Sequence, residues 1–251
     1  MYLVMAIGLL SLAIHEKPII GVKLYVHNVI VILVSLGIPK FAVLHFDNFF
    51  WLTYLPEHYA KKFPGQEEKA RHWMSQQLKY RRGSLEWYCT DFWTKELDIE
   101  IIALKQEVSH LINERPHVMR FLEALAVAKK NRMLVTNAHP KSVELKFSKT
   151  QISPLLDCVI TSHDYGHPKE SQKFWRKFAR DYQFDPKKTL FIDDSISVLR
   201  AAREFGIKYI LCIDSPDSML QTKPCNEFPS ISHFNEILNA TGGLSNAQNT
   251  N

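Results

Sequence analysis

The chain has 251 residues, 46% of them hydrophobic, so it can bury the core of one large domain or of a core with an insert. Its net charge of +5 comes from scattered lysines and arginines rather than from a long basic run. This pattern does not indicate nucleic-acid binding, although a mildly positive surface favours anionic substrates. The four cysteines have no metal-binding spacing, which is typical of buried thiols in a cytoplasmic protein.

Two apolar runs lie in an atypical N-terminal segment, residues 1–46. Met1–Ile14 and Val29–Pro39 are both shorter than the roughly 20 residues that a membrane-spanning helix needs. Met1–Ile14 also lacks the basic start and the cleavage site of a signal peptide, so we expect neither a membrane span nor secretion. Val29–Leu36 is apolar and rich in β-branched residues, which predicts a buried strand.

Residues 47–115 have helical spacing and many aromatic side chains, and they contain no convincing strand. Apolar residues recur there every three to four positions, which indicates helices that bury one face. One such series is Leu85, Tyr88, Cys89 and Phe92. Asp47 precedes the aromatic run, and we expect it to cap the first helix of this segment.

Residues 116–238 alternate between helical and strand patterns, which predicts an α/β fold with a parallel sheet covered on both faces. The small, polar tail at 239–251 is expected to be disordered. The predicted elements are helix Val118–Lys130, strand Met133–Val135, helix Lys141–Ser148, strand Cys158–Thr161, helix Glu170–Tyr182, strand Thr189–Ile192, helix Ser195–Phe205 and strand Lys208–Ile213.

Two adjacent carboxylates, Asp193 and Asp194, follow the predicted strand at Thr189–Ile192. Adjacent carboxylates repel each other, and a divalent cation between them removes that cost. Oxygen ligands of this kind suit Mg²⁺. The alternative is that the two acids cap the following helix, and the pair alone does not separate these interpretations.

Polar side chains also follow the two preceding strands. Thr136 and Asn137 end one strand, and Lys169 lies in the loop after the next. Taken singly, Thr136 is typical of a helix cap and Lys169 of a solvated loop charge. Taken together with the paired carboxylates, they form a set that binds a phosphoryl group and its Mg²⁺ at one edge of the sheet.

The order of Thr136, Lys169 and the acid pair resembles motifs II, III and IV of the haloacid dehalogenase (HAD) superfamily. The sequences FDNFFW, LEWYCTDFW, LVTNAHP, SHDYGHPKE, LFIDDS and SPDS are similar to those of bacterial GMP/IMP 5′-nucleotidases of that superfamily. The resemblance implies a HAD-like Rossmannoid core with a helical cap at residues 47–115. It also implies that Thr136, Asn137 and Lys169 bind phosphate, with Thr136 and Lys169 serving catalysis, and that Asp193 and Asp194 bind Mg²⁺.

The first motif of the family, DxDGT, is missing. Val34, Ser35 and Leu36 occupy the positions of the nucleophile and the general acid, and the chain has no aspartate before Asp47. Asp47 itself is not followed two residues later by a second acid, so the capping role is preferred to a nucleophilic one. Either an altered reading frame or start accounts for the N-terminal segment, or the chain is a pseudo-enzyme.

The sequence therefore predicts a magnesium-dependent phosphomonoesterase for nucleoside 5′-monophosphates, impaired by the missing nucleophile. The alternative is an inactive phosphate-binding or nucleotide-binding module. A response-regulator receiver is disfavoured because receivers place the acidic pair first and the lysine last. His139 and His167 follow motifs II and III closely enough to line a pocket, although loop histidines are usually structural.

Overall fold

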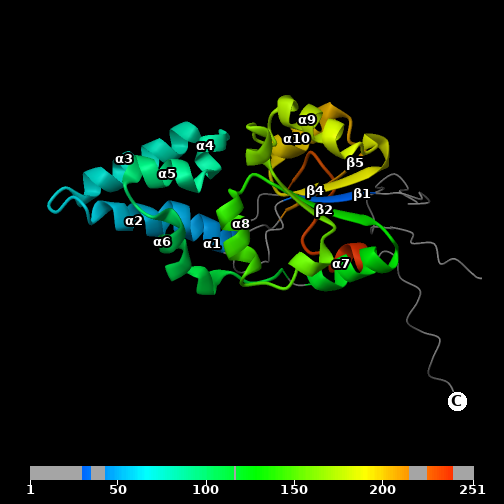
Figure 1. Cartoon of the computed structure of the whole chain (residues 1–251), viewed down its shortest axis with the longest axis horizontal. Coiled ribbons are helices and arrows are strands. Elements are labelled where there is room, and N and C mark those ends of the chain that lie inside the picture. Colours follow the sequence, from blue (N-terminus) through cyan, green and yellow to red (C-terminus); the bar gives the residue numbers. More distant parts are fainter. Residues whose placement is uncertain (1–29, 35–42, 116, 215–224, 240–251) are drawn as a thin grey trace, which may run out of the picture.

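The computed structural model describes residues 30–34, 43–115, 117–214 and 225–239. These residues form two parts, a sheet covered by helices and a bundle of helices that extends from one end of it (Figure 1). None of the helices in these ranges is long and apolar enough to cross a membrane.

The sheet has six parallel strands in the order β3-β2-β1-β4-β5-β6. They are β1 Ile30–Val34, β2 Asn131–Thr136, β3 Cys158–Thr161, β4 Thr189–Asp193, β5 Tyr209–Ile213 and β6 Ser230–Ile231. The α/β fold with a parallel sheet is therefore confirmed.

Strand β1 lies at the centre of the sheet, between β2 and β4. In the register of the backbone, Val34 is opposite Val135 of β2, and Leu33 is opposite Ile192 of β4. Ile30–Val34 of the apolar run Val29–Leu36 thus form a strand, as predicted, and the other residues of the run lie outside the described ranges.

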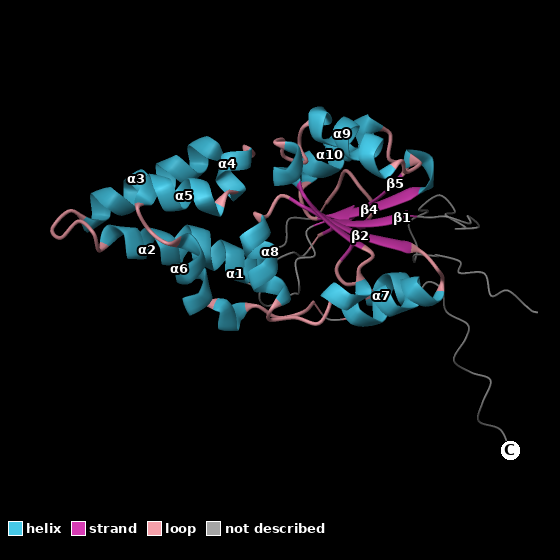
Figure 2. Ribbon diagram, viewed as in Figure 1, coloured by secondary structure: helices cyan, strands magenta, loops and turns pink. Residues whose placement is uncertain are grey.

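Helices cover both faces of the sheet (Figure 2). They are α7 Val118–Val127, α9 Gln172–Tyr182, α10 Ile196–Phe205 and α11 Asn235–Asn239, while α8 Pro140–Phe147 lies between the sheet and the other helices (Figure 1). Because side chains alternate along a strand, Leu190 and Ile192 pack into the apolar cluster that includes α7, whereas Phe191 packs with α9 and α10. Both faces of β4 are therefore buried, as its unbroken apolar sequence predicts.

The predicted elements of this part agree with the observed ones to within three residues at each end. The largest difference is at α7, which was expected to reach Lys130 and ends at Val127. Lys129 there adopts a left-handed conformation with φ of 53°, which terminates the helix.

The second part, which we call the helical lobe, is formed by α1 to α6. Its helices are α1 Val43–Phe49, a π-helical turn Phe50–Tyr54, α2 Leu55–Ala60, α3 Glu67–Arg81, α4 Leu85–Tyr88, α5 Thr90–Leu97 and α6 Ile101–Glu107. Phe46, Phe50 and Trp93 are fully buried at its centre. This apolar core holds the short helices together, since helices of this length are not stable alone.

The series from Leu85 to Phe92 was expected to be the buried stripe of a helix, and this is wrong. The chain is extended at Cys89, which separates α4 from α5, and the core positions are taken by Trp93 and Leu97. The reason is local capping: Ser84 Oγ accepts the amide of Trp87, and Cys89 Sγ accepts that of Phe92.

Candidate active site

A buried ion pair joins the loop after β3 to the end of β4. The Nζ atom of Lys169 lies 2.9 Å from Oδ2 of Asp193, and both side chains are almost completely buried. Lys169 is therefore not the solvated loop charge that its sequence position allowed. Thr136, at the end of β2, is also buried and lines the same cavity.

The backbone of Lys169 is held on both sides. Its N–H donates to Oδ1 of Asn137 over 2.9 Å, and its carbonyl accepts from Nε1 of Trp175 over 2.8 Å. Both bonds are buried, where they are stronger than at the surface. Asn137 thus fixes the loop that carries the lysine, and its side-chain oxygen is already used by that bond.

The two adjacent carboxylates differ in their surroundings. Oδ1 of Asp193 accepts a hydrogen bond of 2.7 Å from the amide of Ser195, and Ser195 is the N-cap residue of α10. The alternative in which Asp193 and Asp194 cap this helix is therefore wrong. Burial, and then the charge of Asp193, raise the pKa of Asp194 to about 7, so ionisation of this carboxyl needs a compensating positive charge.

The helical lobe contacts this site through Tyr88, which the sequence placed only in an apolar helical series. The Tyr88 hydroxyl donates to Oε1 of Glu170 over 3.1 Å, and Nδ2 of Asn137 donates to Oε2 of Glu170 over 2.9 Å. Burial and the Glu170 carboxylate raise the pKa of Tyr88, so the phenol stays protonated. A single glutamate therefore links the lobe to the end of β2.

Asp47 lies inside α1 rather than before it, so the expectation that it caps a helix is wrong. Its carboxylate accepts from Nζ of Lys105 at 3.0 Å and from Nζ of Lys146, on α8, at 2.6 Å. Burial alone would raise the pKa of Asp47, but the two lysines outweigh it and lower the pKa to about 2. Lys105 is itself buried, with its Nζ about 5 Å from the ring centres of Phe46, Phe50 and Trp51.

One cavity of about 510 Å³ contains both groups of charges, at the junction of the lobe and the sheet. Its polar and charged lining includes Asp47, Lys79, Arg82, Lys105, Thr136, Asn137, Lys146, Lys169, Glu170, Asp193 and Asp194, and its aromatic lining comprises Trp51, Trp87 and Tyr88. The structure thus brings together Thr136, Asn137, Lys169, Asp193 and Asp194 in one cavity. A cavity of this size accommodates a small organic ligand.

His139 and His167 are not among the described residues that line this cavity. His139 instead lies beside His163, with ring centres 5.0 Å apart, and His163 was not singled out from the sequence. The expectation of buried thiols holds only for Cys212, since Cys89, Cys158 and Cys225 are half-buried.

Comparison with known proteins shows the family of the chain. Residues 52–212 match the family described as haloacid dehalogenase-like hydrolase. The GMP/IMP nucleotidase YrfG of Escherichia coli (strain K12) is 36% identical over 195 residues, which cover 78% of this chain and 88% of that protein.

Solved structures share the fold at low sequence identity. A HAD phosphatase from Thermococcus onnurineus matches with a TM-score of 0.69 at 18% identity, covering 86% of this chain and 98% of that one. A putative beta-phosphoglucomutase from Thermotoga maritima matches with a TM-score of 0.53 at 16% identity, covering 86% and 92%. The fold is of the Rossmannoid α/β class. The chain belongs to the haloacid dehalogenase-like hydrolase family, within which its sequence is close to that nucleotidase.

Proposed function

We propose that the chain is a HAD-type phosphomonoesterase that uses Mg²⁺ and takes nucleoside 5′-monophosphates such as GMP and IMP. The observation that carries this proposal is the buried Lys169–Asp193 ion pair, 2.9 Å long, which lies with Thr136 and Asp194 in one cavity. The substrate class is supported by the similarity to the E. coli protein named GMP/IMP nucleotidase.

In this proposal Thr136 and Lys169 bind the oxygens of the phosphoryl group, the hydroxyl as a donor and the ammonium as a point charge. Asn137 contributes by position, because its side chain already holds the amide of Lys169 and the carboxylate of Glu170. Catalysis by this set depends on donors that are fixed before the substrate arrives, and the buried bonds to Lys169 provide that.

Asp193 and Asp194 are the residues that would hold Mg²⁺. Their oxygen donors fit this ion, and burial of two neighbouring carboxylates, with a pKa of about 7 at Asp194, marks a place where added positive charge is stabilising. When bound, the ion would neutralise charge that develops on the phosphoryl group.

The cavity wall formed by α1 and α8 is the proposed site for the base. An ionised Asp47 accepts from the N1–H of a 6-oxopurine, and Lys146 donates to its O6. Adenine presents the opposite pattern, an acceptor at N1 and a donor at the 6-amino group. Trp51 and Trp87 offer ring faces for stacking in the same cavity. This pairing supports GMP and IMP over AMP.

We also propose that this chain turns over slowly. Val34 ends β1, opposite Val135 and one residue short of Thr136, and in this proposal it stands at the position of the family's nucleophile. A valine cannot form an acyl-phosphate. Asp47 does not replace it in this proposal, because two lysines hold its carboxylate in ion pairs.

The helical lobe is proposed to act as a lid, with residues 47–115 as the cap domain and 116–238 as the core domain. The Tyr88–Glu170 bond supports this because it joins the lobe to the loop of the phosphate site. A lid that closes on the substrate excludes water from the reaction. The free thiols of the described residues support a reducing, cytoplasmic location.

Release of phosphate from IMP, GMP and AMP by the full chain, with and without Mg²⁺, tests the proposal. We expect slow, Mg²⁺-dependent release that favours IMP and GMP and is lost in Lys169→Met. Equal release from all three nucleotides would contradict the base site. The second candidate is an inactive module that binds the same nucleotides, favoured by Val34, and it is supported if GMP binds but no phosphate is released.

A further inference from the structure

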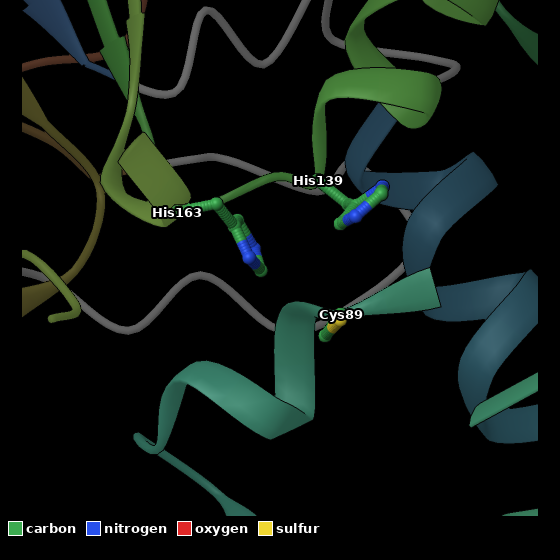
Figure 3. A group of neighbouring side chains, drawn as sticks. All are labelled: Cys89, His139 and His163. Carbon is green, nitrogen blue, oxygen red and sulfur yellow. The ribbon is translucent and has the colours of Figure 1, made fainter. Parts of the chain in front are cut away.

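Three side chains of metal-binding type meet outside the cavity, where the helical lobe contacts the sheet domain (Figure 3). The Sγ atom of Cys89 and one ring nitrogen each of His139 and His163 all lie within 4.8 Å of one another. Cys89 comes from the extended residue between α4 and α5, His139 precedes α8, and His163 lies in the short helix Ser162–Tyr165 after β3. The cluster therefore bridges three separate elements and both parts of the molecule.

Hydrogen bonds already orient both imidazole rings. Nε2 of His163 lies 3.1 Å from the carbonyl oxygen of Asn137, and because a carbonyl only accepts, Nε2 carries the proton and Nδ1 has the lone pair. Nδ1 of His139 lies 2.9 Å from Oγ1 of Thr90. Histidines that bind metals in proteins donate their second N–H to an oxygen as His163 does here, which fixes the ring and the tautomer.

The sulfur and a nearby carboxylate complete the donor set. Sγ of Cys89 lies at the N-terminus of the eight-residue helix α5 and accepts the amide of Phe92 over 3.4 Å, so the position of the sulfur is fixed by the backbone. Asp91, in the first turn of the same helix, places Oδ2 3.7 Å from Nε2 of His139. Thiolate, two imidazoles and one carboxylate or water form a tetrahedral set for a transition metal.

We propose that Cys89, His139 and His163 form a Zn²⁺ site, with Asp91 or water as the fourth ligand, that ties the helical lobe to the core. This site is chemically distinct from the pair Asp193 and Asp194, because sulfur and nitrogen donors select zinc-like ions whereas carboxylates select Mg²⁺.

Zinc at this site acts on the phosphate site through Asn137. The carbonyl of Asn137 accepts from His163, and its side chain holds Lys169 and Glu170. An ion shared by Cys89 and the two histidines keeps the lobe and the Asn137 loop in one arrangement. A zinc ion bound at this site therefore slows the movement of the helical lobe. The lobe has to move when a ligand enters or leaves the cavity.

Metal binding to the full chain, stripped with a chelator and reduced, tests the proposal directly. We expect one equivalent of Zn²⁺ to bind in calorimetry with saturating Mg²⁺ present. Co²⁺ in its place should give the strong visible bands of a tetrahedral site and a thiolate-to-cobalt charge-transfer band in the near ultraviolet. The charge-transfer band should vanish in Cys89→Ser, and His163→Ala should weaken binding by at least about tenfold.

Matched controls separate this cluster from other donors. Cys158→Ser removes another half-buried thiol, His167→Ala another loop histidine, and Asp193→Asn the carboxylate site, and each should leave the cobalt spectrum unchanged. If Cys89→Ser does not fold, Cys89→His keeps a ligand and should retain Zn²⁺ binding without the charge-transfer band. The proposal is overturned if the parent chain binds no Zn²⁺ under these conditions, or if Cys89→Ser and His163→Ala bind it as the parent does.

Discussion

The hydroxyl of Tyr88 lies 3.1 Å from the carboxylate of Glu170, and this bond connects the helical lobe to the residue that follows Lys169. The other oxygen of Glu170 accepts from Asn137. The Glu170 carboxylate thus accepts one hydrogen bond from each part of the molecule. The position of the helical lobe is therefore coupled to the position of the loop that carries Lys169.

Tyr88→Phe removes this donor and keeps the ring. We expect the free energy of unfolding to fall by about 1–2 kcal/mol, because a partly buried hydrogen bond to a carboxylate is lost. Of the two donors Tyr88 and Asn137, Glu170 then keeps only Asn137. Urea unfolding measures the change. The control is Tyr80→Phe, which alters a highly exposed tyrosine at the end of α3. Equal stabilities of the two variants would show that the bond does not hold the lobe.

Asp194→Asn tests the assignment of Mg²⁺ to the acid pair. For the parent chain we expect Mg²⁺ with inorganic phosphate to raise the melting temperature, since a ligand that binds only the folded state adds about 2.7 kcal/mol at a hundred times its Kd. The variant should lose the Mg²⁺-dependent part of this shift. Asp98→Asn, a fully exposed acid of the lobe, is the control and should behave as the parent. The same Mg²⁺-dependent shift in Asp194→Asn would contradict the metal assignment.

Restoring the first motif tests whether its absence limits the chain. The variant combines Val34→Asp, Leu36→Asp and Ile38→Thr, which together with Ser35 and Gly37 recreate the DxDGT pattern. We expect phosphate release from IMP to rise at least about 10²-fold, because general acid–base catalysis alone typically contributes 10²–10⁴-fold.

The control for this variant is the same triple change combined with Lys169→Met, which should return to the parent rate. Rapid release by the unmodified chain, abolished by Asp47→Asn, would instead identify Asp47 as the nucleophile.

Asp47→Asn tests recognition of the base. An amide at this position donates as well as accepts, so it no longer favours the N1–H of a 6-oxopurine over the N1 acceptor of adenine. We expect the ratio of GMP to AMP affinity to fall by at least tenfold in calorimetry, with inorganic phosphate affinity unchanged. Glu68→Gln on the exposed face of α3 serves as the control. An unchanged ratio would remove Asp47 from the base site.

The lowered pKa of Asp47 also predicts how the free energy of unfolding depends on pH. Its pKa is lowered from 3.8 to about 2, so the unfolded chain takes up the proton before the folded one does. The ion pairs with Lys105 and Lys146 therefore contribute fully above about pH 4, by about 2 kcal/mol, and this contribution is lost as the pH falls towards 2. Denaturant unfolding between pH 5 and 2.5 measures it. In Asp47→Asn the free energy of unfolding should fall less steeply as the pH is lowered. An identical pH profile in the variant and the parent would refute the ion-pair account.

The sheet and the grouping of Thr136, Lys169 and Asp193 at its edge were predictable from the sequence because their signals are local. Strands β1 to β5 each contain an apolar run; Thr136 and Asp193 directly follow such runs, and Lys169 lies in the loop after β3. Parallel strands place their carboxyl ends at one edge, so order along the chain was enough to gather these side chains.

Contacts between the lobe and the core were not predictable in the same way. Asp47 meets Lys105 and Lys146 across long stretches of chain, and Cys89 meets His139 and His163, with no spacing rule that relates them. Asp47 was misassigned as a cap because the acid precedes an aromatic run, a pattern typical of helix starts. In the structure the Asp47 carboxylate instead forms ion pairs with Lys105 and Lys146. This tertiary interaction overrides the local preference for a helix cap.

The central position of β1 in the sheet affects how the chain folds while it is being synthesised. The neighbours of β1 in the sheet, β2 and β4, begin at Asn131 and Thr189. Because β1 is the first of the described strands to be synthesised, it has no neighbouring strand to pair with until the ribosome has made these later segments. At 5–20 residues per second that wait is on the order of ten seconds, with an apolar strand exposed. Changes in Ile30–Val34 will therefore alter the yield of folded protein during synthesis, independently of any effect on chemistry.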